Sequence, residues 1–172
     1  HELNQPGCYR NIKDTSVIAQ FQVTRNEQSK KLLNKTNNEV YLVAWTTTPW
    51  TLPSNTALAV GKKISYLLIE TLNQYTGKEI TIIMAKDLAS KYFSAANSQL
   101  KFNDYTIGAK DLPYKIITEI KGAALEGLRY KQLFDYAQPQ DGDAFRIILA
   151  DFVTTEDGTG IVHLAPSFGA DD

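Results

Sequence analysis

The most informative part of the sequence is Val40-Tyr41-Leu42-Val43-Ala44-Trp45-Thr46-Thr47-Thr48-Pro49-Trp50-Thr51-Leu52-Pro53-Ser54-Asn55. Its first part, residues 40–45, is short and apolar on both faces, which is typical of a strand inside a domain. Pro49 and Pro53 each remove a backbone donor and disfavour helix for the residue before them. We therefore predict a buried strand that runs directly into an ordered loop.

Most of the remaining chain also has the pattern of short strands. Val17, Ala19, Phe21 and Val23 alternate with polar residues, which predicts a half-buried strand over 17–24. Apolar runs predict further strands or apolar stretches at 57–60, 64–71, 79–84, 114–120, 145–153 and 161–165, with a hairpin turn at 74–78. Asp157-Gly158-Thr159-Gly160 is a tight-turn sequence between the last two strands.

Two segments do not follow the strand pattern. Residues 25–38 are polar and have little to bury, which predicts a surface loop. Leu88, Ala89, Tyr92 and Phe93 follow helical spacing and predict a helix over 86–95. The fold class expected from these elements is α+β and mainly β, a barrel or sandwich with peripheral helices, in a single domain spanning 1–172.

Composition narrows the class of protein. The chain has 172 residues, enough for one domain, and 18 basic against 19 acidic residues give a net charge of −1. That balance argues against a general nucleic-acid binder but not against binding one single-stranded end. No apolar run is long enough for a membrane span, and no signal segment opens the chain. The lone Cys8 favours a reducing, cytoplasmic setting, and because Met84 is the only Met, we expect a processed chain or a piece of a longer one.

Several common catalytic motifs are missing from the sequence. There is no GxxxxGK[ST], GxGxxG before a helix, HExxH, CxxC or GxSxG. The chain has only two histidines, His1 and His163, so no histidine-based metal site is expected.

The threonine run is the first candidate for chemistry. Thr46 and Thr48 should share one side of the chain, and Thr47 should point to the other. Three threonines can reflect strand propensity alone, yet hydroxyls held by a proline-stiffened loop can also position a sugar, an adenine edge or an attacking water. Asn55 adds a donor and an acceptor, or serves only as a turn residue.

The second candidate is the C-terminal stretch from Gly158 to Asp172. His163 shares a strand face with apolar neighbours, so it is either a packed, hydrogen-bonded histidine or a functional one. Asp171 and Asp172 are either solvated charges or receptors for a substrate ammonium group. A triad of His163, Ser167 and Asp172 is not expected, because nothing positions the serine as an exposed nucleophile.

The two stretches together, Trp45 to Asn55 and Gly158 to His163 with Ala165-Pro166, Gly169 and Asp171-Asp172, resemble the editing domain of isoleucyl-tRNA synthetase. This domain is the connective-peptide insertion of that class I enzyme. The two signatures occur in the family's order, and residues 11–21 resemble the entry into the insertion, so the resemblance covers essentially the whole chain. Ser54 stands where the family often has Ala, a small departure.

Features of the same stretches separate the chain from related families. The leucyl and valyl enzymes carry an Arg where this chain has Thr48, and the valyl enzyme lacks a His at the position of His163. The HIGH and KMSKS signatures do not occur here. The resemblance therefore implies no amino-acid activation by these residues. ATP and Mg, with Zn as a further candidate, are expected to be needed only in the parent enzyme.

The resemblance implies hydrolysis of the ester in mischarged Val-tRNA(Ile), with Ile-tRNA(Ile) excluded by a second, smaller sieve. It implies that substrate contacts come from Trp45, Thr46, Thr47, Thr48, Thr51, Asn55, His163 and Asp172. All of these except Trp45 and Thr51 are also expected to take part in catalysis. Thr48 and His163 would limit the space for the side chain, and Asp172 would pair with the α-ammonium group.

No side chain is a convincing general base, so a held water, helped by a ribose hydroxyl of the substrate, is expected to attack. The implied partners are the 3′ end of the tRNA, the valyl moiety and the rest of the synthetase. The chain itself is expected to be a cytoplasmic monomer without membrane contact. Two alternatives stay open: a non-catalytic β module that binds an aminoacyl or nucleotide ligand, and an editing domain of another specificity, such as valyl.

Overall fold

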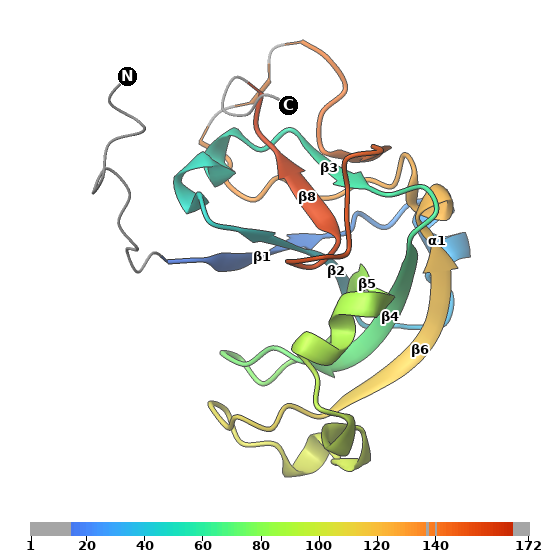
Figure 1. Cartoon of the computed structure of the whole chain (residues 1–172), viewed down its shortest axis with the longest axis vertical. Helices are drawn as coiled ribbons and strands as arrows, with labels where there is room; N and C mark the ends of the chain where they lie inside the picture. Colours follow the sequence, from blue (N-terminus) through green and yellow to red (C-terminus); the bar gives the residue numbers. More distant parts are fainter. Residues whose placement is uncertain (1–14, 137, 140, 167–172) are drawn as a thin grey trace, which may run out of the picture.

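Two open, mixed β-sheets form the framework of the protein (Figure 1). The computed structural model describes residues 15–136, 138–139 and 141–166. The expectation of a mainly β chain with short helices is confirmed. The barrel is not: within the described ranges each sheet has open edges, and no closed barrel forms.

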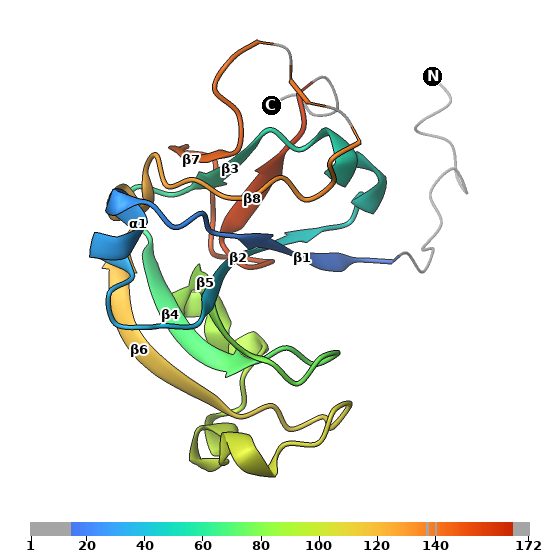
Figure 2. The same cartoon turned by 180° about the vertical axis from the view of Figure 1, so that it is seen from behind.

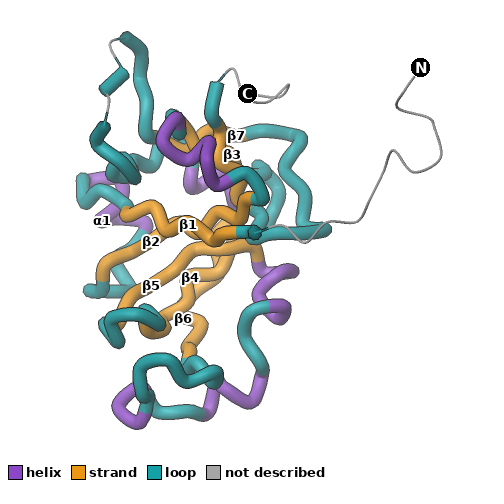
Figure 3. The backbone as a smooth tube through the Cα atoms, turned by 90° about the vertical axis from the view of Figure 1, so that its left-hand side faces the viewer, coloured by secondary structure: helices purple, strands orange, loops and turns teal. Residues whose placement is uncertain are grey.

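The first sheet has five strands in the order β1-β2-β5-β4-β6. In Figure 3, β1 lies at the upper edge of this sheet and β6 at the lower edge. The pair β2–β5 is parallel and the other three pairs are antiparallel. The predicted turn at 74–78 joins an antiparallel pair, as expected for a hairpin. The strands span Val17–Gln22 (β1), Glu39–Thr46 (β2), Ser65–Leu72 (β4), Glu79–Ala85 (β5) and Tyr114–Lys121 (β6).

The second sheet has three strands in the order β7-β3-β8, with β3 (Ala57–Val60) at its centre. β3 runs parallel to β7 (Arg146–Leu149) and antiparallel to β8 (Ile161–Leu164). The turn at 157–160 is present, but it does not join paired strands, because β3 lies between β7 and β8. β7 is also shorter than the predicted 145–153.

A short segment, residues 128–131, links the outer strands of the two sheets. We call it the bridging segment. On one side, Lys131 N donates to Gln22 O at 2.7 Å, just beyond which Val23 and Tyr130 form an isolated bridge. On the other side, Tyr130 N donates to Phe145 O at 3.1 Å, and Ile147 N donates to Leu128 O at 2.9 Å. The segment therefore holds the edge of β1 and the edge of β7 in fixed relation.

The helices are short and lie around the sheets, as Figure 2 shows from behind. The expected surface loop at 25–38 instead contains α1 (Glu27–Leu32), which a reciprocal capping box between Asn26 and Ser29 starts. The helix expected at 86–95 is a shorter 3₁₀-helix, η3 (Lys86–Lys91). The other 3₁₀-helices are η2 (Pro49–Ser54), η4 (Ala95–Gln99), η5 (Phe102–Asp104) and η6 (Gly122–Leu125).

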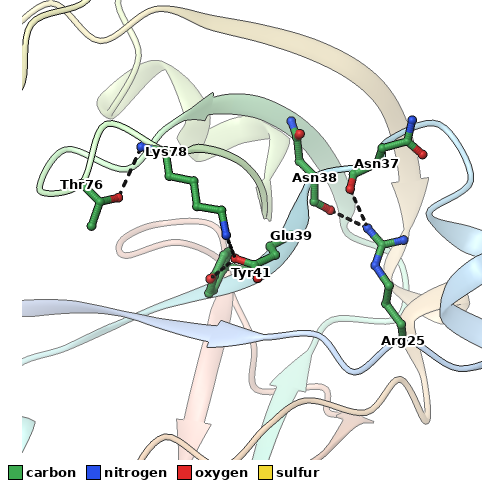
Figure 4. Close-up of polar contacts among 7 residues, drawn as sticks. All are labelled: Arg25, Asn37, Asn38, Glu39, Tyr41, Thr76 and Lys78. Carbon is green, nitrogen blue, oxygen red and sulfur yellow. Dashed lines mark hydrogen bonds and ion pairs between the residues drawn. The ribbon is translucent and has the colours of Figure 1, made fainter.

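Polar contacts at the start of β2 fix the loop that enters it (Figure 4). Lys78 Nζ lies 2.8 Å from Glu39 Oε2, and the Tyr41 hydroxyl donates to the same carboxylate at 3.0 Å. These bonds, that from Lys78 first, hold the pKa of Glu39 below its ordinary value. Arg25 Nη2 donates to both carbonyl oxygens of residues 37–38, at 3.0 and 2.7 Å.

One continuous core joins the two sheets. Phe21 and Leu42 of the first sheet and Leu58 and Ile147 of the second are fully or almost fully buried in the same cluster. β2 and β8 pack against each other, so the end of β2 lies next to the second sheet. No helix in the described part of the chain is long and apolar enough to cross a membrane.

Candidate functional site

The segment after β2, predicted as an ordered loop, is instead a 3₁₀-helix, η2, and Pro53 lies inside it. Pro49 occupies its first turn, where a missing N–H costs no hydrogen bond. Thr51 N donates to Thr48 O at 3.0 Å, and Asn55 N donates to Leu52 O at 3.1 Å. The two prolines and these bonds hold Thr51 and Asn55 on one short, ordered element.

The threonines divide as the alternation predicted. Thr46 is buried, and its Oγ1 lies 3.2 Å from Thr48 Oγ1 and accepts from Thr48 N at 3.0 Å. Thr46 and Thr48 therefore share one side. Thr47 and Thr48 are exposed, as is Trp50, so this end of the cluster is open to solvent.

His163 on β8 meets η2 through both ring nitrogens. Nε2 lies 2.8 Å from Thr51 Oγ1, and Nδ1 lies 3.0 Å from Asn55 Nδ2. Because an amide nitrogen only donates, Nδ1 is the acceptor, and the ring proton assigned from this network sits on Nε2. The Thr51 hydroxyl in turn donates to Thr48 O at 2.8 Å.

Asn55 is the hub of the cluster, and its side chain is buried. Its Nδ2 donates to Ala57 O at 2.9 Å as well as to His163, and its Oδ1 accepts from the Tyr130 hydroxyl at 2.6 Å. Burial raises the pKa of Tyr130 well above its ordinary value, so this hydroxyl is a donor throughout the neutral range.

Tyr130 was missed by the reasoning from sequence. It lies in the bridging segment, which has neither strand periodicity nor a recognisable motif. Only the pairing of residues far apart in the chain brings it to Asn55, 75 positions away. No local signal could have found it.

Trp45 lies apart from this cluster. It precedes Thr46 on β2 and so points to the other face of the strand. There, with Ile18, Tyr75 and Tyr92, it lines a groove with a volume of about 540 Å³. Its expected contact with substrate stays a prediction that the arrangement of the cluster does not favour.

The turn before β8 is held from two sides. The Tyr66 hydroxyl donates to Gly160 O at 2.6 Å and accepts from Gly61 N at 3.0 Å. Ala85 N donates to Thr159 O at 2.8 Å. Gly160 has a φ of 72°, and a Cβ placed on it would lie 2.4 Å from Ala85 Cβ, so a larger residue would displace the start of β8.

Ser167, Asp171 and Asp172 fall outside the described residues, so their expected roles stay predictions. Within residues 15–136, 138–139 and 141–166, no three His, Cys, Asp or Glu side chains gather as a metal ion would require. The cluster around Asn55 offers hydroxyl, amide and imidazole groups. Such groups suit an uncharged, oxygen-rich ligand and can orient a water molecule.

Comparison with known proteins gives two kinds of likeness. No family model matches the chain. It is 54% identical over 172 residues to the isoleucine–tRNA ligase of Bacteroides fragilis, 43% over 189 aligned residues to that of Treponema denticola and 38% over 172 residues to that of Clostridium novyi. These alignments cover 100% of this chain but 15%, 16% and 13% of those ligases, so the chain spans a small part of their length.

The structural likeness is to editing domains of another synthetase. The crystal structure of GlLeuRS-CP1 matches with a TM-score of 0.60 and 20% identity, over 88% of this chain and 55% of that chain. The P. knowlesi cytosolic leucyl-tRNA synthetase editing domain matches with a TM-score of 0.58 and 16% identity, over 86% of this chain and 56% of that chain. At these identities the matches establish a shared fold.

Proposed function

We propose that this chain, a segment of the isoleucine–tRNA ligase family with the fold of a synthetase editing domain, hydrolyses the aminoacyl ester of Val-tRNA(Ile) and spares Ile-tRNA(Ile). One observation carries the proposal. His163 and Asn55 come from different elements, yet they form one hydrogen-bonded cluster with Thr51 of η2. These are the residues that the resemblance to editing domains assigns to the site.

The proposed chemistry follows from the absence of a general base among the described residues of the cluster and from the hydroxyl and backbone groups that it contains. Both ring nitrogens of His163 are engaged, at 2.8 and 3.0 Å, so the ring is not poised to take a proton from water. The reaction therefore proceeds by orientation: hydroxyl and backbone groups near Thr47 and Thr48 hold a water, and a ribose hydroxyl of the tRNA end assists its attack. Donors at the same place stabilise the oxyanion that forms on the ester carbonyl.

Discrimination between the valyl and isoleucyl esters comes from side chains that hydrogen bonds hold in place. His163 is bound at both nitrogens and Thr48 is bonded to Thr46, so neither side chain moves aside easily for a longer ligand. An extra methylene on the substrate would have to displace these groups. A site that binds the shorter valyl group and excludes isoleucyl acts as the second sieve that the synthetic pocket needs.

Asp172 completes the proposed site. Its carboxylate pairs with the free α-ammonium of the aminoacyl group, which selects an aminoacyl ester over an ordinary ester. The hydrolysis uses no metal and no ATP. Its partners are the single-stranded 3′ end of tRNA(Ile) and the remainder of the ligase, which supplies the basic surface that a chain of net charge −1 lacks.

The test is deacylation of two esters by the 172-residue chain and by a ligase that carries it. We expect release of valine from Val-tRNA(Ile) and little release of isoleucine from Ile-tRNA(Ile). Equal rates for the two esters would refute the sieve, and no hydrolysis of either by the intact ligase would refute the function. Faster hydrolysis of another mischarged tRNA would assign the other specificity.

The ammonium role has its own test, with the neighbouring carboxylate as the control. Asp172→Ala should reduce the rate on Val-tRNA(Ile), whereas Asp171→Ala should stay near the wild-type rate. If Asp172→Ala keeps both the rate and the preference for the valyl ester, the carboxylate does not bind the ammonium group.

A further inference from the structure

We propose that Tyr130 is a positioning residue for this site: it fixes the side-chain amide of Asn55, and through that amide it fixes which ring nitrogen of His163 carries the proton. The inference rests on the proposed function for its effect on hydrolysis. The link from Tyr130 to His163 rests on geometry alone.

Ring packing and backbone hydrogen bonds hold Tyr130 in place, in addition to the hydrogen bond of its hydroxyl. Its side chain is only 3% exposed. The ring packs edge-on against Phe21, with centroids 5.3 Å apart, and against Phe145, with centroids 6.2 Å apart. Its backbone is part of the bridging segment, bonded toward both sheets. These contacts therefore fix the position of the hydroxyl, which donates to Asn55 Oδ1 at 2.6 Å.

The hydroxyl determines which way the amide faces. With Oδ1 on Tyr130, Nδ2 is directed to Ala57 O at 2.9 Å and to His163 Nδ1 at 3.0 Å. The reversed amide would place Oδ1 against the carbonyl of Ala57 and present an acceptor to Nδ1. Because Asn55 is 4% exposed, water cannot compensate for the mismatch.

The amide in turn selects the tautomer of His163. A ring nitrogen that faces an N–H donor must be unprotonated, so the proton is on Nε2, where it is donated to Thr51 Oγ1 at 2.8 Å. The other tautomer would set N–H against N–H at Asn55 and would leave Nε2 without a proton for Thr51. Tyr130 thus keeps His163 in one tautomer and one orientation, as a fixed wall of the site.

The experiment is nitrogen NMR of the imidazole rings in the ¹⁵N-labelled 172-residue chain, combined with deacylation of Val-tRNA(Ile). With His1 and His163 as the two histidines of the chain, their ring signals are readily assigned. Wild type should show His163 with a protonated Nε2 and an unprotonated Nδ1. Tyr130→Phe keeps the ring and loses the hydroxyl, so it should show a mixture of tautomers and a kcat about two- to tenfold lower, with KM little changed.

Tyr66→Phe is the matched control. Tyr66 is also fully buried, and its hydroxyl also makes a 2.6 Å bond, but to the backbone of Gly160 and not to Asn55. It should keep the wild-type tautomer of His163. A wild-type tautomer in Tyr130→Phe, or the same mixture in both variants, overturns the positioning role.

Two further results distinguish failure of the proposed function from failure of the link between Tyr130 and His163. If the wild-type chain does not hydrolyse the ester while Tyr130→Phe shifts the tautomer, the proposed function fails and the link to His163 stands. Should Tyr130→Phe not fold, the wild-type chain still decides. The hydroxyl proton of Tyr130, bound to Oδ1, should exchange slowly with water, and rapid exchange overturns the proposal.

Discussion

The hydroxyl of Thr51 offers the sharpest measurement on the site, because the chain contains a matched partner for it. Thr51→Val keeps the shape of the side chain and removes two short bonds, the one donated to Thr48 O at 2.8 Å and the one accepted from His163 Nε2 at 2.8 Å. It also removes a longer contact of 3.4 Å with Thr48 Oγ1. Thr71→Val removes only one, donated to Pro113 O, also at 2.8 Å. Both threonines are buried.

The expected magnitudes follow from this difference. A net hydrogen bond contributes about 1 kcal/mol, so Thr71→Val should lower the free energy of unfolding by about 1 kcal/mol and Thr51→Val by about 2 kcal/mol. The difference of about 1 kcal/mol is the bond to His163. The same loss should slow hydrolysis of Val-tRNA(Ile) about fivefold in Thr51→Val and leave the rate of Thr71→Val unchanged.

Urea unfolding of the 172-residue chain measures the change in the free energy of unfolding, and an unchanged m-value indicates that only stability has altered. Single-turnover deacylation measures the change in the rate of hydrolysis. Equal losses of stability in the two variants would show that the contact with His163 contributes nothing. A normal rate in Thr51→Val would remove this bond from the account of the site.

Three further outcomes are expected. Gly160→Ala should lower the free energy of unfolding by about 2–4 kcal/mol in urea, because its Cβ would lie 2.4 Å from Ala85 Cβ and its φ of 72° disfavours any side chain; a loss below about 1 kcal/mol would contradict this. Burial raises the pKa of Tyr66 to about 12 from 10.0, so the contribution of Tyr66 to the free energy of unfolding is complete below pH 10 and is lost as the pH rises to 12, by about 3 kcal/mol at most. Tyr66→Phe should flatten the dependence of the free energy of unfolding on pH between pH 10 and 12, and an unchanged slope in this variant would contradict the assignment to Tyr66. Lys78→Met should let the pKa of Glu39 rise toward its ordinary value in an NMR titration, and an unmoved pKa would assign the lowering to another group.

Much of the strand content was predictable because it depends on local pattern. The alternation from Val17 and the apolar run from Val40 both mark strands that the structure contains. The helix α1 was missed because its start depends on a reciprocal cap between Asn26 and Ser29 rather than on apolar periodicity. The arrangement of the described strands into two open sheets rather than a closed barrel could not be predicted, because pairing between distant strands, such as that of β3 with β7, is not encoded in any one segment.

Part of the site was also predictable from the sequence. The threonines, Asn55 and His163 stand in recognisable stretches, and the structure brings Thr51, Asn55 and His163 within hydrogen-bond distance. The partner of Asn55 on its other side could not be foreseen. Tyr130 reaches the site through the bridging segment, whose place depends on the edges of both sheets.

The central place of β3 has a consequence for how the protein is made. β3 is synthesised before both of its sheet partners, which come some ninety to a hundred residues later in the chain. Until β7 and β8 have been synthesised, Thr51 and Asn55 have no second sheet to pack against and no histidine to hold. A nascent chain that ends before β8 is complete therefore cannot form the hydrogen bonds that join His163 to Thr51 and Asn55.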